Sequence, residues 1–122
     1  MKIKASILKY ESSREFFTPE GCFILELSNS PADPQASIAR ARVLPGAITR
    51  WHRVRGITER YVILEGIGQV EIGDLPPQAV GPGDVVLIPP DCRQRLANTG
   101  ERDLIFLCVC TPRFVPEAYE AL

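Results

Sequence analysis

Three side chains that could bind a metal ion or transfer protons lie in short runs of alternating residues: His52, Glu59 and Gln94. Imidazole, carboxylate and amide groups can all bind metals, and the first two also act as general acids and bases. His52 is the only histidine, so no other imidazole could replace it. Gln94 is flanked by Arg93 and Arg95. Because side chains alternate along a strand, placing both arginines outside puts Gln94 inside.

Two further polar residues share the predicted faces of these candidates. Arg50 lies two residues before His52, and Tyr61 lies two residues after Glu59, which is the spacing of neighbours on one strand face. Arg50 could bind the carboxylate or phosphate of an anionic ligand, or form a salt bridge with Glu59 or Glu65. Tyr61 could orient a substrate or donate a proton, or pack inside with its hydroxyl group hydrogen-bonded. The predicted catalytic residues are Glu59 and Tyr61, and the predicted ligand-binding residues are Arg50, His52 and Gln94.

The elements that must position these residues are short β-strands. Strand-like runs recur along the chain, whereas helical periodicity is hard to find. We predict strands over Lys2 to Lys9, Cys22 to Leu27, Ser37 to Leu44, Thr49 to Val54, Glu59 to Leu64, Gly68 to Ile72, Val85 to Ile88, Arg93 to Ala97 and Leu104 to Cys110. Most of the 11 prolines and 9 glycines fall between these runs, where they form turns. The tail, Pro116 to Leu122, is predicted to form a short helical turn.

This pattern predicts an all-β protein in which residues 1–122 form one domain. A chain of 122 residues is long enough for one hydrophobic core and too short for two. A barrel or two-sheet roll closes or shortens its own edges, which keeps a strand-rich chain soluble. The interior of such a barrel has room for one small ligand.

Composition excludes several classes of protein. Fourteen basic and 15 acidic residues give a formal net charge of -1, without the basic excess that binding to a nucleic-acid backbone requires. The longest apolar stretch is far shorter than the roughly 18 residues of a membrane span, and no secretory signal is evident. We therefore expect a cytoplasmic protein with neither nucleic-acid nor membrane partners. The four cysteines are expected to be free thiols, with Cys108 and Cys110 packing as small apolar groups on one strand face.

Two segments of the chain resemble the conserved motifs of the cupin superfamily. The first, at residues 46–66, has Gly46, five residues, His52, one residue, Val54, four residues, Glu59, six residues and Gly66. The second, at residues 83–98, has Gly83, five residues, Pro89, four residues, Gln94, three residues and Asn98. The spacing matches both motifs at every defined position. The resemblance implies a six-stranded core β-barrel, or double-stranded jelly roll, with additional flanking strands.

The resemblance also implies a metal in the barrel, which cupins hold with three histidines and one glutamate. Those positions fall on His52, Val54, Glu59 and Gln94, so two of the four ligands depart from the pattern. Valine has no donor atom, whereas glutamine offers an amide oxygen. A reduced site of His52, Glu59 and Gln94 would suit a divalent ion such as Mn, Fe or Ni, with Zn also among the candidates. Alternatively, the three residues form a hydrogen-bonded polar cluster in a pocket without a metal.

Two functions follow from these alternatives. In the first, the pocket binds a divalent metal and acts on a sugar or small acid as an isomerase, dioxygenase or lyase. In the second, a pocket without a metal binds a sugar or carboxylate, and the protein is a carrier or sensor without catalysis. The resemblance also implies a homodimer. Candidate contacts for this dimer are Trp51, the N-terminal strand, and the tail around Phe114 and Val115.

Overall fold

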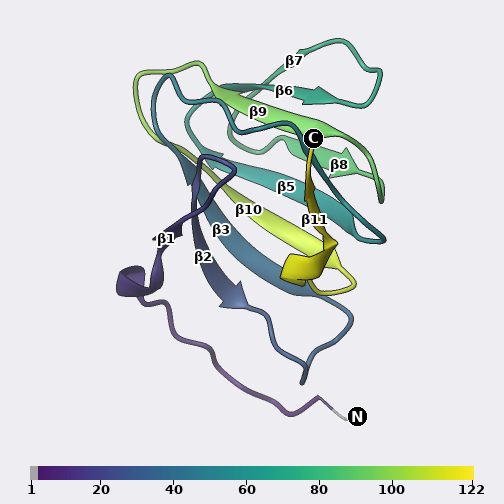
Figure 1. The fold of residues 1–122 in the computed structure, drawn as a ribbon. Coiled ribbons are helices and arrows are strands. Elements are labelled where there is room, and N and C mark those ends of the chain that lie inside the picture. Colours follow the sequence, from purple (N-terminus) through teal and green to yellow (C-terminus); the bar gives the residue numbers. More distant parts are fainter. Residues whose placement is uncertain (1–2) are drawn as a thin grey trace.

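The strands form two antiparallel sheets, seen in Figure 1, in a computed structural model that describes residues 3–122. The six-stranded sheet has the order β1 (Phe16–Phe17), β2 (Phe23–Ser28), β3 (Ser37–Val43), β10 (Leu104–Thr111), β5 (Thr58–Glu65) and β8 (Val85–Ile88). The five-stranded sheet has the order β11 (Tyr119–Ala121), β4 (His52–Val54), β9 (Gln94–Asn98), β6 (Gly68–Ile72) and β7 (Gln78–Val80). Two short 3₁₀ helices, η1 (Ser12–Arg14) and η2 (Pro116–Ala118), complete the described elements. This is the jelly-roll architecture that the sequence predicted.

Side-chain alternation decides which residues enter the interior. In β5 the buried residues are Glu59, Tyr61 and Ile63, and the residues between them are only partly buried. In β9 Gln94 is buried, whereas Arg93 before it is exposed, as predicted. Pairing then fixes neighbours, because Glu59 lies opposite Cys110 in one sheet and His52 lies opposite Gln94 in the other.

Two apolar clusters fill the interior. The larger contains most of the fully buried aliphatic side chains, among them Val43, Ile63 and Leu96. The smaller joins Val54 and Cys110 to the C-terminal segment. Members of both clusters also line one cavity, so the space for a ligand lies between them.

The second motif ends in a side chain that fixes a turn. Asn98 is buried and its amide nitrogen donates to the carbonyl oxygens of Val43 and Arg102, both at 2.8 Å. Its amide oxygen accepts a hydrogen bond from the Gly100 backbone nitrogen at 2.9 Å. Asn98 therefore fixes the turn over residues 98–102 and joins it to the end of β3, which is a structural role.

Both chain ends differ from prediction. The strand predicted for Lys2 to Lys9 is not found over residues 3–9, which have no regular structure and are exposed; Lys2 lies outside the described residues. Apolar alternation was present there, but no neighbouring strand pairs with it. The helical turn predicted for the tail is only η2, after which the chain continues as β11 and pairs with β4. The short strands β1 and β7 were not predicted either. Within residues 3–122, no helix is long and apolar enough to cross a membrane.

Candidate functional site

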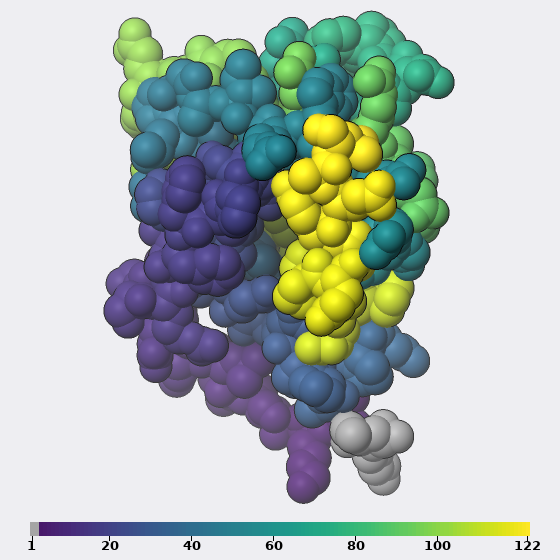
Figure 2. Space-filling model, in the orientation of Figure 1, coloured from purple at the N-terminus to yellow at the C-terminus, as the bar shows by residue number. Residues whose placement is uncertain are grey.

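An internal cavity of about 320 Å³ lies between the two sheets, at the lower end of the range for small-molecule sites. Its lining comes from β1, β2, β3, β5 and β10 of one sheet, from β4, β9 and β11 of the other, and from loops near both chain ends. In Figure 2 the N-terminal residues (purple) and the C-terminal segment (yellow) border a recess on this side of the molecule. The lining is largely apolar, with four ionisable side chains that are neither thiols nor phenols: Glu20, Glu26, His52 and Glu59.

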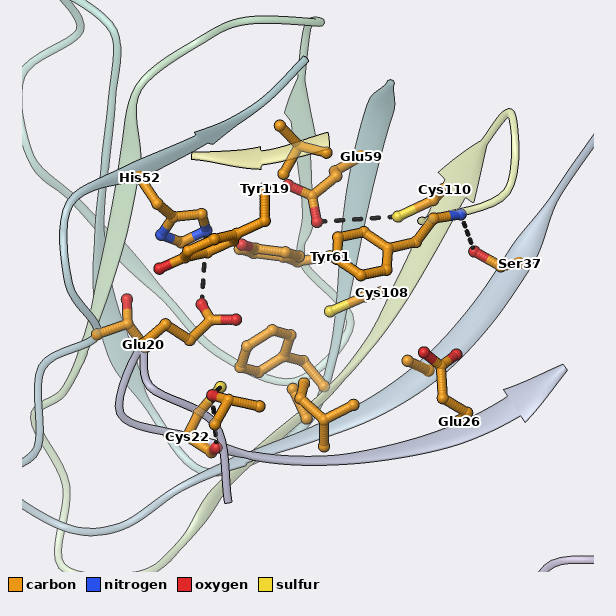
Figure 3. A pocket seen from close by; sticks show the side chains of 18 of the residues that line it. Glu20, Cys22, Glu26, Ser37, His52, Glu59, Tyr61, Cys108, Cys110 and Tyr119 are labelled. Atoms are coloured by element: carbon orange, nitrogen blue, oxygen red, sulfur yellow. Dashed lines mark hydrogen bonds and ion pairs between the residues drawn. The ribbon is translucent and has the colours of Figure 1, made fainter. Parts of the chain in front are cut away.

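His52 is held on three sides. Its Nδ1 atom lies 2.7 Å from the carbonyl oxygen of Arg50, and because a carbonyl only accepts, Nδ1 must carry the proton. The ring of Tyr119 stacks on the imidazole, with centroids 5.2 Å apart. The Nε2 atom faces the carboxyl group of Glu20 (Figure 3). The distance from Nε2 to Oε2 of Glu20 is 3.5 Å. In the neutral ring, Nε2 is therefore an available proton acceptor at the cavity wall.

Glu20 reaches the cavity from the loop between β1 and β2. Gly21 has a φ of +100°, a conformation that favours glycine and turns the chain directly after Glu20. The Glu20 carbonyl oxygen accepts a hydrogen bond from the Arg50 backbone nitrogen at 2.8 Å, which ties the loop to the segment before β4. Burial raises the pKa of the Glu20 carboxyl group to about 7, and a hydrogen bond with Cys22 lowers it in part.

Glu59, Gln94 and Tyr61 form a buried hydrogen-bonded chain. The Tyr61 hydroxyl group donates to Oε1 of Gln94, and Nε2 of Gln94 donates to Oε1 of Glu59 at 2.6 Å. The second carboxyl oxygen of Glu59 lies 3.8 Å from the thiol of Cys110. Burial raises the pKa of Glu59, while the Gln94 hydrogen bond and the charge of His52 act in the opposite direction. Gln94 thus orients the Glu59 carboxyl group, whose other oxygen lies on the cavity side with Cys110 (Figure 3).

The hydrogen bonds also decide what Tyr61 and Gln94 can do. Burial raises the pKa of the Tyr61 hydroxyl group well above its usual value, and that group already donates to Gln94. Gln94 does not line the cavity, and both ends of its amide are engaged. Gln94 contacts Glu59 directly, and Tyr61 contacts it through Gln94. Tyr61 also lines the cavity, but its hydroxyl proton is directed to Gln94.

The predicted metal ligands do not fit a metal ion as a set. The amide oxygen of Gln94 is occupied by Tyr61, and Val54 provides no donor atom. His52 and Glu59 remain, which is one imidazole and one carboxylate. Within residues 3–122, no group of three or more His, Cys, Asp or Glu side chains is arranged to hold a metal ion. Gln94 and Glu59 are hydrogen-bonded to each other, whereas His52 contacts Arg50 and Glu20 rather than either of them.

Strand alternation predicted that the side chain of Arg50 shares the inward face with His52, but in the structure it does not. Its side chain is exposed and does not line the cavity, although Thr49 and His52 are both buried. β4 begins only at His52, and the three preceding residues leave the sheet pattern because Arg50 pairs its backbone nitrogen with Glu20. The side-chain period of two therefore does not extend back to residue 50.

Three of the four cysteines line the cavity: Cys22, Cys108 and Cys110. All four are free. Burial raises the pKa of the thiols of Cys22 and Cys110 to about 12, and that of Cys108 well above its usual value. Protonated thiols behave as small apolar groups, so these residues shape the cavity as predicted for Cys108 and Cys110.

Glu20, Glu26 and Tyr119 were missed by sequence reasoning. All three line the cavity, yet they lie outside both motifs, in the β1–β2 loop, in β2 and in β11. The available signal for Glu20 was the following Gly21 between two apolar runs, which is typical of a hairpin turn. No local signal showed that this turn would meet His52.

Fold and cavity together define a small β-barrel protein with an internal site for a small molecule. A sequence model of the cupin domain matches residues 39–110, more than half of the chain. The chain belongs to the cupin family. It is 32% identical to the uncharacterized protein MJ1618 of Methanocaldococcus jannaschii, covering 93% of this chain and 92% of that protein.

Solved structures share the fold at low sequence identity. KdgF from Halomonas sp. matches with a TM-score of 0.77 and 16% identity, covering 89% of this chain and 96% of that one. The nucleoside dehydratase Pac13, from Streptomyces, matches with a TM-score of 0.77 and 17% identity, covering 96% and 92%. At such identities the similarity establishes the fold alone.

Proposed function

We propose that this chain binds a small polar molecule in the cavity and acts on it by general acid–base chemistry, as an isomerase or a lyase. The observation that carries the proposal is the pair of buried His52 and partly buried Glu20, whose facing atoms are 3.5 Å apart at the cavity wall. A carboxyl group whose pKa is about 7 can be either proton donor or acceptor near neutral pH.

The residues divide into two proton-transfer groups. Nε2 of His52, with Glu20 beside it, can accept a proton from a bound molecule, and Glu20 can share that proton. Glu59 is the second group, oriented by Gln94 from behind. An isomerase or lyase needs one group to remove a proton and another to return it or to protonate a leaving group. Both groups line one cavity, so one ligand can contact both.

Of the three reaction types predicted from the sequence, isomerase and lyase fit this donor set better than dioxygenase. The cavity offers groups for proton transfer, and its predicted metal ligands do not form a set. A protein with this fold is a nucleoside dehydratase, and related structures contain uridine. Removal of water is acid–base chemistry, so this neighbour provides a precedent for the proposed class on this barrel.

A binding protein without catalysis is the second candidate. The observation in its favour is that the Tyr61 hydroxyl group donates its hydrogen bond to Gln94, so its proton is not directed at a ligand although the ring lines the cavity. In this case the cavity would hold its ligand without changing it.

Deuterium exchange tests the proposal and separates the two candidates. The protein is incubated in D₂O with pools of sugars, nucleosides and small acids, and proton NMR measures deuterium incorporation and product formation. We expect exchange at a carbon of one compound, lost in His52→Ala and reduced in Glu59→Gln. The matched control is Glu101→Gln, an exposed glutamate outside the cavity, which should behave like the wild type. A compound that binds without exchange or product would support the binding protein instead.

Assembly as a homodimer stays a prediction. The guanidinium groups of Arg93 and Arg95 both lie over the indole of Trp51, with their Cζ atoms 4.7 and 4.5 Å from the ring centroid. This stack is on the outer face of the five-stranded sheet, where a second copy could contact it. Sedimentation of the wild type and Trp51→Ala would test that contact.

A further inference from the structure

The cavity has an unusual balance of charge. Its lining includes the carboxyl groups of Glu20, Glu26 and Glu59, and His52 is the one basic side chain that residues 3–122 contribute to it. No lysine or arginine in this described part of the chain lines it. Glu26 lies near Arg113 and Arg14, whose charges partly offset its own. Glu20 and Glu59 have no such neighbour among the described residues that contact them.

Several glutamates outside the cavity are paired with arginines. On the outer surface, carboxyl groups form ion pairs with arginines at 2.6 to 2.9 Å: Glu15 with Arg42, Glu71 with Arg95 and Glu120 with Arg53. The two cavity carboxyl groups contact an imidazole, an amide and thiols instead. A buried carboxylate is stable only with a compensating charge or several hydrogen bonds. Among the described residues, the imidazole of His52 is the one group that can offer these two carboxylates a positive charge, so a cationic ligand would supply the second.

Aromatic rings form a large part of the remaining wall, beside aliphatic side chains and thiols. Five phenyl and phenol rings line the cavity: Phe16, Tyr61, Phe106, Phe114 and Tyr119. Tyr61 and Phe106 pack with centroids 4.7 Å apart at an interplanar angle of 49°. The faces of such rings attract cations, and their area favours apolar ligand groups. Figure 3 shows the carboxyl groups of Glu20 and Glu59 directed toward the space that Tyr61 and Tyr119 border.

We propose that the cavity binds a small organic cation, in which a protonated amine contacts Glu20 and Glu59 and an apolar body packs on the aromatic wall. This inference rests on the proposed function only in taking the cavity as the ligand site, and it adds the class of ligand. A carboxylate or phosphate would meet two carboxyl groups without a lysine or arginine to compensate them. A bare metal ion would leave the aromatic wall unused and lacks a group of ligands in residues 3–122.

The test uses three probes of one shape that differ in charge: benzylamine, benzyl alcohol and benzoate. Their dissociation constants are measured by titration calorimetry and ligand-observed NMR at pH 8, where benzylamine is protonated and Glu20 is mostly ionised. We expect benzylamine to bind at least tenfold more tightly than benzyl alcohol, and benzoate to bind most weakly. Glu59→Gln should lose at least tenfold in benzylamine affinity while its affinity for benzyl alcohol stays within twofold. Glu20→Gln provides a second variant if Glu59→Gln is unstable, and Glu101→Gln is the control.

Several outcomes would overturn the inference. They are equal binding of benzylamine and benzyl alcohol, tighter binding of benzoate, no binding of any probe, or an amine affinity that neither glutamine variant reduces. These results leave the proposed function standing, since deuterium exchange into a neutral or anionic compound is measured separately. Conversely, tight amine binding with no exchange into any amine would retain the ligand class and contradict catalysis.

Discussion

His52 and Glu20 face each other across 3.5 Å, although they come from a barrel strand and from a hairpin loop 32 residues earlier in the chain. The loop is tied to the barrel through the backbone of Arg50, whose carbonyl oxygen also holds the imidazole of His52. One short segment thus fixes both partners. Any change in the charge of the pair should affect the stability of the fold as well as ligand binding.

The first prediction concerns pH and stability. Burial raises the pKa of Glu20 from its ordinary value of 4.5 to about 7, so between these values the folded chain holds a proton that the unfolded chain has released. The free energy of unfolding should therefore be highest below pH 4.5 and fall as pH rises toward 7, by up to about 3 kcal/mol from this group. Glu20→Gln removes the effect.

Urea unfolding between pH 5 and 8 checks this prediction. Other acidic groups also contribute to the slope, because burial raises the pKa of Glu26 and Glu59 in the same direction. The difference between the wild type and Glu20→Gln isolates Glu20. The variant curve should be flatter and lie above the wild type at pH 8, and parallel curves would contradict the assignment.

The second prediction concerns Gln94, which is 1% exposed and joins Tyr61 to Glu59. Gln94→Leu leaves both partners without a hydrogen bond inside the barrel, so we expect a loss of about 2 to 4 kcal/mol in the free energy of unfolding. Arg95→Leu, the next residue on the opposite face, removes a partly exposed pair with Glu71 and a contact with the Trp51 ring, and should cost about 1 kcal/mol. Similar losses in the two variants, measured by urea unfolding, would show that the hydrogen bonds of Gln94 with Tyr61 and Glu59 contribute little to the free energy of unfolding.

The motif spacing was sufficient to predict the fold and the side of the sheet that holds His52, Glu59 and Gln94, because those residues lie on regular strands with period-two burial. Arg50 was placed wrongly because the same period was extended beyond the start of β4, into a segment that pairs with the Glu20 loop. Alternation is informative only where the chain is a strand.

Longer-range contacts were not predictable from the same patterns. Glu20 and Tyr119 enter the site from near opposite ends of the chain, and only pairing in three dimensions brings them to His52. The strand predicted at the N-terminus has the right alternation over residues 3–9 but no partner strand, and the predicted helical tail instead gains β4 as a partner for β11. Local β-propensity does not show which strand edges of the folded sheets are available for pairing.

The third prediction concerns metal binding. Because Gln94 is engaged and Val54 has no donor atom, the wild type and His52→Ala should both retain less than about a tenth of an equivalent of metal after soaking with Mn, Fe, Ni or Zn and dialysis. Val54→His combined with Gln94→His restores the cupin ligand pattern and should bind about one equivalent. Plasma mass spectrometry on protein without a histidine tag measures both. Stoichiometric metal in the wild type that disappears in His52→Ala would show that the pair with Glu59 suffices.

The last prediction uses the thiols as reporters of the cavity. Thiolates react with disulfide reagents, and burial raises the pKa of all four thiols. Cys22, Cys108 and Cys110 line the cavity, whereas Cys92 lies outside it. At pH 8 one of the four thiols should therefore react rapidly with an aromatic disulfide, and the other three should react only as fast as the fold opens. Cys92→Ser should abolish the rapid phase, and all remaining thiols should react at once in denaturant. A rapid phase of two or more thiols in the folded protein would mean that the cavity cysteines are accessible and partly ionised, contrary to their role as apolar lining.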